Sequence, residues 1–486
     1  MILFKWVERG LGLVSTVFLV RLLSPGDFGM ISMALSFIFM AEMLASFSFD
    51  VALIQNQSAS VDHYHSAWTA NVMLGGVITL VMLALALPIT HFYKQPALLP
   101  VICALSLGPL FGGLENIGVV AFRKDLDFRK EFIFQVSRKV LAFCTTIPLA
   151  FLLNSYWALV AGILVSKGGG TAMSYWVHPF RPRFSLSEMG SLLRFSKWLL
   201  LNNLVIFFKE RSTDFVIGRF YGPAPLGVYN VSNEFASLPC NEMGAPINRA
   251  LFPGLAKMAG QKDAMRTAFA NASGLVAILA VPAGFGIFAV APFMVPVVLG
   301  KQWLAGVPVM EILSINSSLL VFHGTITTAL IAAGKPSAAT RTNLLSVVIM
   351  VAGLFTLTGR FGSVGAAYSV LIACVASTPI YLLQLRKYVD VPLSNFLRVV
   401  MRPLIASIGI IAAVRLALPA YNTAMTSLTA GLWLAAGVAL GTVVYGALML
   451  ALWYLMGRPD GAEQQVLDRI RTRVPAWVPL PAKQID

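Results

Sequence analysis

The chain has 486 residues, of which 57% are hydrophobic and only 12% are charged. About a quarter of the residues of a soluble domain are charged, so this composition excludes a water-soluble enzyme built around a single core. The four cysteines all lie inside apolar runs, which excludes a disulfide scaffold. The formal net charge of +15 has two explanations, nucleic-acid binding or basic loops on one side of a membrane.

Apolar segments follow one another along nearly the whole chain. A helix that crosses a bilayer needs about 20 predominantly apolar residues. About 14 segments qualify, at 3–23, 28–54, 67–90, 97–121, 132–153, 156–177, 196–218, 225–247, 272–299, 305–333, 342–359, 363–385, 399–418 and 428–456. The sequence therefore predicts an all-α polytopic membrane protein.

The basic residues gather in alternate loops between these segments. With the N-terminus inside, most of the 36 Lys and Arg residues fall in the inner loops. The outer loops hold Arg21, Lys94, Arg219, Lys301, Arg360 and Arg415. Cytoplasmic loops carry the excess of Lys and Arg in membrane proteins, so we expect both termini to face the cytoplasm. This distribution explains the basic charge and predicts no nucleic-acid partner.

A short motif occurs twice. The run Arg21-Leu-Leu-Ser-Pro-Gly-Asp-Phe-Gly29 returns as Arg219-Phe-Tyr-Gly-Pro-Ala-Pro-Leu-Gly227. Both copies match R-x-x-x-P-x-x-x-G and follow the first helix of a six-helix set, which predicts two parallel repeats plus two extra helices. The expected parts are an N-lobe at 1–178, a cytoplasmic inter-lobe loop at 179–195, a C-lobe at 196–386, two further helices within 396–457 and a cytoplasmic tail at 458–486.

Several cations lie inside the predicted spans, where an ionisable group is costly and therefore a functional candidate. Lys167 has no acidic neighbour in sequence and lies too deep to reach the headgroups. Arg138 and Lys139 either face a cavity or extend to the inner headgroups. Lys209 and Arg211 either pair with nearby acids or supply donors for an anion. Guanidinium and ammonium groups in both halves suit a phosphate, so we expect a cationic substrate site.

A polar stripe follows the eighth segment. Asn230, Glu234, Asn241 and Asn248 recur on one helical face, and Asn203 lies in the segment before. Such a stripe does not face lipid. It either lines a hydrated cavity or forms hydrogen bonds between helices.

Three acidic residues within the predicted spans are candidates for coupling to an ion, namely Asp214, Asp50 and Glu42. The sequence holds no P-loop, no Gly-x-Ser-x-Gly elbow and no Rossmann glycine set, and its His and Cys spacings fit no metal site. Every predicted outer loop is short, which argues against a membrane glycosyltransferase or polymerase. We therefore expect a transporter without catalytic residues, metal or cofactor.

Further motifs carry a family resemblance. Besides the two copies above, they are Ala52-Leu-Ile-Gln55, Phe122-Arg-Lys-Asp-Leu-Asp-Phe-Arg129, Trp157-Ala-Leu-Val-Ala-Gly162, Asp214-Phe-Val-Ile-Gly-Arg-Phe-Tyr-Gly222, Leu226-Gly-Val-Tyr229 and Leu251-Phe-Pro-Gly-Leu255. Over most of the first 390 residues the chain resembles the bacterial polysaccharide (Wzx-type) flippases. These belong to the multidrug/oligosaccharidyl-lipid/polysaccharide exporter superfamily.

The resemblance implies a V-shaped exporter fold with two six-helix lobes around a central cavity. It implies an inner-membrane flippase that translocates undecaprenyl-diphosphate-linked oligosaccharide repeat units, by alternating access, for lipopolysaccharide or exopolysaccharide biosynthesis. The family's cationic cavity agrees with Lys167, Lys209 and Arg211. The implied partners are the lipid-linked oligosaccharide, membrane lipids, and the polysaccharide polymerase and export machinery. The alternative is a cation-coupled multidrug exporter of the same superfamily, although such exporters usually have twelve helices.

Overall fold

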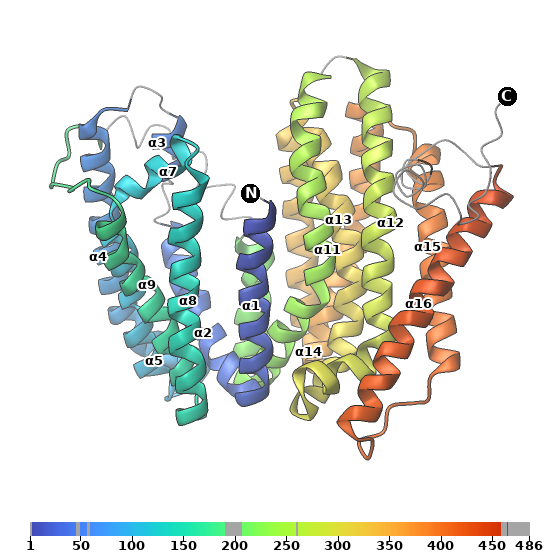
Figure 1. The fold of residues 1–486 in the computed structure, drawn as a ribbon, viewed down its shortest axis with the longest axis horizontal. Coiled ribbons are helices and arrows are strands. Elements are labelled where there is room, and N and C mark those ends of the chain that lie inside the picture. The colour runs from blue at the N-terminus through green and yellow to red at the C-terminus, as the bar shows by residue number, and fades with distance from the viewer. Residues whose placement is uncertain are drawn as a thin grey trace. The chain divides into compact units, whose positions relative to one another are not determined.

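The computed structural model describes residues 2–44, 49–55, 59–189, 207–258, 261–457 and 464. These residues form helices joined by short connections, and no strand occurs among them, which confirms the predicted all-α class (Figure 1). The helices are α1 (Ile2–Leu22), α2 (Pro25–Leu44), α3 (Phe49–Gln55), α4 (Val61–Tyr93), α5 (Leu98–Leu105), α6 (Leu107–Leu114), η1 (Ile117–Val119), α7 (Val120–Lys124), α8 (Phe128–Leu153), α9 (Trp157–Val177), the helical residues 207–221, α11 (Pro223–Lys257), α12 (Lys262–Met294), η2 (Val295–Leu299), η3 (Lys301–Gly306), α13 (Val307–Ala332), α14 (Pro336–Val389), α15 (Leu393–Ala417) and α16 (Ser427–Leu455).

A helix occupies the described part of each predicted spanning segment. Among the described residues, 8 helices are long and apolar enough to cross a membrane, and a ninth candidate is the pair Leu98–Leu114 and Ile117–Lys124, bent by 65°. The 54 residues of α14 contain a break at Gly362, whose φ is 59°. The stretches before and after this break each have more than 20 residues, enough for a helix to cross a membrane, so α14 fits the two segments predicted at 342–359 and 363–385.

Several predicted segments differ from the helices in detail, among them the ninth, predicted at 272–299, whose helix α12 begins already at Lys262. The second divides into α2 and α3, and the fourth divides into α5, α6, η1 and α7. The eighth, predicted at 225–247, extends as α11 to Lys257. Hydropathy marks only the apolar part of a helix, whereas backbone hydrogen bonding continues into polar residues and stops at breaks that hydropathy does not detect.

Packing divides the chain into two compact units. Unit 1 comprises Met1–Val231, Val298–Trp303 and Val351–Ala366, and unit 2 comprises Ser232–Val297, Leu304–Met350 and Ala367–Asp486. Residues 207–231, which belong to the predicted C-lobe, pack within unit 1. The units are defined by packing and the predicted lobes by the repeat, so the lobe limits stay a prediction.

The two copies of the repeated motif meet inside unit 1. The first turns of α2 and α11 cross so closely that a Cβ at Gly29 would overlap the backbone of Pro223, and a Cβ at Gly227 would overlap the carbonyl of Pro25. Each glycine therefore packs on the proline of the other copy. This exchange of identical contacts is the arrangement that a local two-fold axis produces.

The motif arginines extend the reciprocal arrangement. Arg21 donates from Nε to the carbonyl of Val298 at the end of η2, 3.1 Å away. Arg219 lies over the ring of Phe92, next to the end of α4, with 5.6 Å to the ring centroid. In each copy the arginine thus contacts the end of the third spanning helix of the other six-helix set.

In unit 2 the last two helices pack onto α12. Ala289 and Val290 of α12 form one buried cluster with Ile410 and Val414 of α15. Gly437 of α16 brings that helix against Val290 and Val414. The absence of a side chain at this glycine permits the close approach.

Candidate functional site

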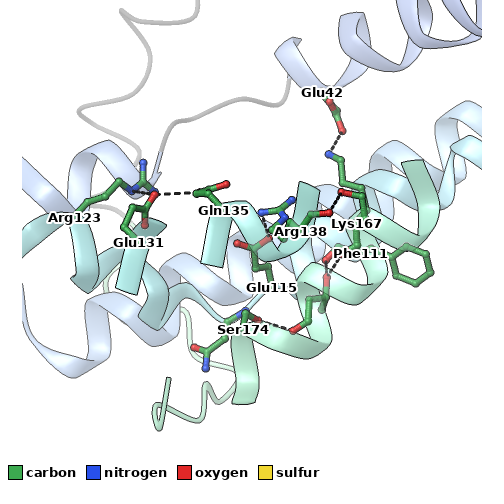
Figure 2. Close-up of polar contacts among 12 residues, drawn as sticks. Glu42, Phe111, Glu115, Arg123, Glu131, Gln135, Arg138, Lys167 and Ser174 are labelled. Atoms are coloured by element: carbon green, nitrogen blue, oxygen red, sulfur yellow. Dashed lines mark hydrogen bonds and ion pairs between the residues drawn. The ribbon is translucent and has the colours of Figure 1, made fainter. Parts of the chain in front are cut away.

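Four charged side chains from different elements of unit 1 form two ion pairs (Figure 2). Arg138 of α8 donates from Nη1 to Oε2 of Glu115, between α6 and η1, at 3.1 Å. Nζ of Lys167, on α9, lies 3.5 Å from Oε1 of Glu42, on α2. We call Glu42, Glu115, Arg138 and Lys167 the charge cluster. Two cations and one ion-coupling candidate from the sequence analysis therefore come together.

The charge cluster lies at membrane depth and remains accessible. Arg138 is ten residues from the start of α8 and Lys167 is ten from the end of α9, so each is about 15 Å along its helix from the predicted cytoplasmic end. The side chains of Arg138 and Glu115 are 22% and 21% exposed, and those of Lys167 and Glu42 are 36% and 29% exposed. The cluster is formally neutral, so an anionic ligand must compete with the two carboxylates.

The run of three glycines after Lys167 shapes this site. A Cβ at Gly170 would overlap the side chain of Arg138, and one at Gly169 would overlap Leu141. Thr171 donates to the carbonyl of Phe111 at 2.6 Å, which fixes α9 against α6. The small residues of α9 thus leave the space in which the Arg138 guanidinium lies.

A break in the membrane span positions Glu115. The next residue, Asn116, is fully buried, and its Oδ1 accepts from the backbone N–H of Gly118 at 2.9 Å. Its Nδ2 donates to the carbonyl of Phe180 at 2.7 Å, and its backbone N–H donates to Oγ of Ser174 at 2.9 Å. Broken helices occur in transporters where backbone or side-chain groups face a substrate or ion site.

Asn116→Ala is expected to lower the free energy of unfolding by about 2–4 kcal/mol, because it leaves buried backbone groups without partners. Unfolding of the purified protein in denaturant measures the change. Asn422→Ala is the matched control, because Asn422 is exposed and also accepts from a nearby backbone N–H. Equal stability of the two variants would contradict the assigned role of Asn116.

A second group of charges lies at the predicted cytoplasmic end of unit 1. Asp50 pairs with Arg123 at 3.3 Å and so lies outside the charge cluster. Hydrogen bonds from Lys130 hold the pKa of Asp127 below its ordinary value. Partial burial, together with nearby cations, lowers the pKa of His178, whose Nδ1 accepts from the backbone N–H of Phe180 at 3.2 Å. Both the lowered pKa and the accepting Nδ1 favour the neutral imidazole of His178.

Arg211 and Asp214 pair with each other. Their side chains approach to 3.1 Å, and Asp214 is only 1% exposed. The Arg211 guanidinium lies over the ring of Phe39, 4.9 Å from its centroid. Arg211 thus has the local acidic partner that the sequence offered, and its role as a donor for an anion stays a prediction. Lys209 lies half-buried two residues earlier.

The residues of the polar stripe on α11 differ in their surroundings: one bonds to a neighbouring helix and two are exposed. Asn248 accepts from Thr325 of α13 at 2.9 Å, so here the stripe forms an interhelical hydrogen bond. Glu234 and Asn241 are exposed. Asn203 lies outside the described residues, as do residues 190–195 of the predicted inter-lobe loop and all of the tail except residue 464. A cavity-lining role for the stripe stays a prediction.

Comparison with known protein families identifies the family of this chain. Residues 18–308 match the family described as "Polysaccharide biosynthesis protein", which is more than half of the chain. The chain belongs to this family. It is 26% identical to the succinoglycan biosynthesis transport protein ExoT of Rhizobium meliloti over 99% of this chain and 97% of that protein. It is also 26% identical to the lipopolysaccharide biosynthesis protein WzxC of Escherichia coli, over 76% of each chain.

Solved structures share the fold of this family member. The lipid II flippase MurJ in an inward closed conformation aligns with a TM-score of 0.76 at 15% identity, covering 94% of this chain and all of that one. An inward-facing multidrug resistance MATE family transporter of the MOP superfamily aligns with a TM-score of 0.61 at 14% identity, covering 79% of this chain and 94% of that one. The resemblance and the exporter fold predicted from the sequence are confirmed.

From the sequence alone, Glu115 is one of several acids that could relay a proton or pair locally, and it is not among the predicted site residues. Its partner Arg138 lies 23 residues away on the next long helix, so no helical spacing links the two. One signal was present. Glu115-Asn116 interrupts an apolar segment with two adjacent polar residues, which is the pattern expected at a helix break inside a membrane.

Proposed function

We propose that this protein is a flippase that translocates undecaprenyl-diphosphate-linked oligosaccharide repeat units for lipopolysaccharide or exopolysaccharide biosynthesis. The observation that carries the proposal is the charge cluster, because it offers accessible cations at membrane depth. Relatives named for polysaccharide biosynthesis or transport align along most of the chain, and the fold is shared with a lipid II flippase.

In this proposal the diphosphate binds the cations of the charge cluster. Arg138 presents a planar fork of N–H donors and Lys167 presents a compact ammonium group, and both geometries suit phosphate oxygens. Glu115 and Glu42 neutralise the two cations while the site is empty of substrate. The arriving diphosphate displaces these carboxylates, and Glu42 then becomes available to take up a proton or another cation. Lys139, Lys209 and Arg211 extend the cationic path, and Asp50 and Asp214 are further coupling candidates.

Alternating access then releases the substrate on the outer side. An inside-negative potential favours outward movement of negative charge by about 2.3 kcal/mol per elementary charge per 100 mV. The prenyl tail stays in the lipid throughout, so only the polar head crosses the protein. The polar face of α11 contributes hydroxyl-binding groups to this path.

The proposed setting is the bacterial cytoplasmic membrane, with the N-terminus and the C-terminus on the cytoplasmic side. The support is the excess of Lys and Arg in the inner loops. The partners in this proposal are membrane lipids and the polymerase and export machinery that consume the translocated repeat unit.

Complementation tests the function. A strain that lacks its flippase and carries a matched repeat-unit pathway is expected to regain surface polymer when it expresses the wild-type protein. A drug-sensitive strain without its own exporters serves as the parallel arm, because the MATE transporters share the fold. Unchanged drug sensitivity is expected there. Drug resistance without polymer in any of several matched pathways would instead support the multidrug exporter.

A further inference from the structure

A second polar site lies in unit 2, away from the charge cluster. A cavity of about 330 Å³ opens where α12 and α15 end and α13 begins, beside the connection from α15 to α16. Its lining includes Pro292, Phe293, Val307, Val414, Arg415 and Tyr421. The ring of Tyr421 meets that of Phe293 edge to face, with centroids 5.9 Å apart, and forms one wall. The cavity thus combines apolar walls with one guanidinium group.

This cavity lies at the end of the helices that we expect to face outward. The opposite ends of α11 to α15 carry most cations of unit 2, among them Arg266, Lys335 and Lys387. Arg415 lies two residues before the end of α15. An arginine so close to the end of a spanning helix lies at the level of the lipid headgroups.

The Arg415 side chain is held in one orientation and keeps donors for a ligand. Its Nη2 donates to the carboxylate of Glu311 and to the carbonyl of Phe288. Its Nε and Nη1 donate to no atom in the described part of the chain. These two nitrogens carry three of the five guanidinium N–H groups. Since the side chain is 40% exposed, an anion in the cavity can reach them.

The start of α13 adds positive potential. Val307, the first residue of α13, lines the cavity, and the N-cap residue Gly306 provides no side-chain hydrogen bond to the first turn. Pro308 in this first turn has no N–H, so the contribution of this end is the positive end of the helix dipole, which favours negative charge. The carboxylate of Glu311 accepts from Nη2 of Arg415, which leaves Nε and Nη1 and this end of the dipole for an anion.

The surroundings indicate a lipid as the source of the anion. Leu416, next to Arg415, is 87% exposed, and Leu428, at the start of α16, is 75% exposed. Exposed leucines at the end of spanning helices provide a surface for acyl chains. A molecule with apolar chains on this surface places its headgroup at the level of the cavity.

We propose that this cavity binds the phosphate group of a membrane lipid from the outer leaflet, with Arg415 as the principal donor. The site is independent of the proposed transport path. The lipid would fix the outer end of α15 against α12 and α13.

Native mass spectrometry of the purified protein tests the proposal, with phosphatidylglycerol as the probe. Arg415→Gln is expected to weaken retention of the tightest-bound lipid about tenfold, the effect of one lost charge-assisted contact. Glu311→Gln is expected to retain the lipid as well as the wild type or better, because it removes the competing carboxylate. Glu311→Gln/Arg415→Gln contains no unpaired charge, and it is expected to lose the lipid while staying folded.

Three controls can overturn the proposal. Arg360→Gln removes another exposed cation from the same predicted side, and loss of lipid equal to that of Arg415→Gln would refute the site. Diacylglycerol with the same chains lacks phosphate, so equal competition by it would refute phosphate recognition. If millimolar inorganic phosphate displaces the bound lipid completely, the site binds free phosphate and the assignment to a lipid is wrong.

Discussion

Arg138→Ala is expected to abolish polymer restoration, or to reduce it at least tenfold, at wild-type levels in the membrane. The substitution removes the proposed phosphate donors and leaves Glu115 without its 3.1 Å partner inside a membrane span. Lys167→Ala is expected to act in the same direction but less strongly, because its partner distance is longer and both side chains are more exposed. Surface polymer in the complementation assay measures both effects.

Double variants that remove both charges of an ion pair separate an effect on substrate binding from an effect on folding. Glu115→Gln/Arg138→Gln leaves no unpaired charge, so it is expected to reach the membrane normally and still to fail in transport. Glu115→Gln alone keeps a hydrogen-bond acceptor and releases Arg138 from its carboxylate, so it is expected to fold and to retain transport. Lys130→Ala is the matched cation control, because Lys130 is 59% exposed and forms an ion pair with nearby Asp127, outside the charge cluster. Wild-type polymer from both Arg138→Ala and Lys167→Ala would refute the charge cluster as the substrate site.

The sequence located the apolar segments of unit 1 because hydropathy and charge act locally, but it did not detect the breaks that divide α2 from α3 and α6 from η1. A run of apolar residues around Lys167 is sufficient to place that cation inside a span. Its partner Glu42 lies on α2, far away in sequence, and only the tertiary packing of α2 and α9 brings the two together. Ion pairs between helices that are distant in sequence leave no periodic pattern, so the sequence overstated the net charge of the site.

Some contacts that the sequence left open depend on neighbours on other helices. Asn248 had two interpretations, and the position of Thr325 on α13 gives the interhelical hydrogen bond. The break before Asn116 depends on carbonyls that a distant segment supplies, among them that of Phe180. By contrast, the repeated motif was recognised directly, because identical residues recur at identical positions. Its structural meaning appeared only when both copies were seen in contact.

Gly29→Ala and Gly227→Ala are each expected to destabilise the protein by about 1–3 kcal/mol, the usual cost of overpacking. In each variant the new Cβ would overlap backbone atoms of the proline in the other copy. A side chain can rotate away from a clash, but helix backbone at Pro223 or Pro25 moves only if α2 and α11 separate. The same separation strains the contacts of Arg21 and Arg219. We therefore expect weaker polymer restoration as well as a lower thermal midpoint.

The reciprocal geometry makes the double variant the decisive measurement. Once one alanine has separated α2 and α11, the second meets a gap that is already open, so Gly29→Ala/Gly227→Ala should cost less than the two single changes together. Gly26→Ala is the matched control within the same motif, because a Cβ there meets only Oγ of Ser24 at 3.6 Å, an ordinary contact. Additive effects of Gly29→Ala and Gly227→Ala would show that the two glycines do not share one crossing. Because alanine has a higher helix propensity than glycine, Gly26→Ala is expected to keep or slightly raise the stability. A destabilisation by Gly26→Ala of equal size would show that the effect does not come from the crossing.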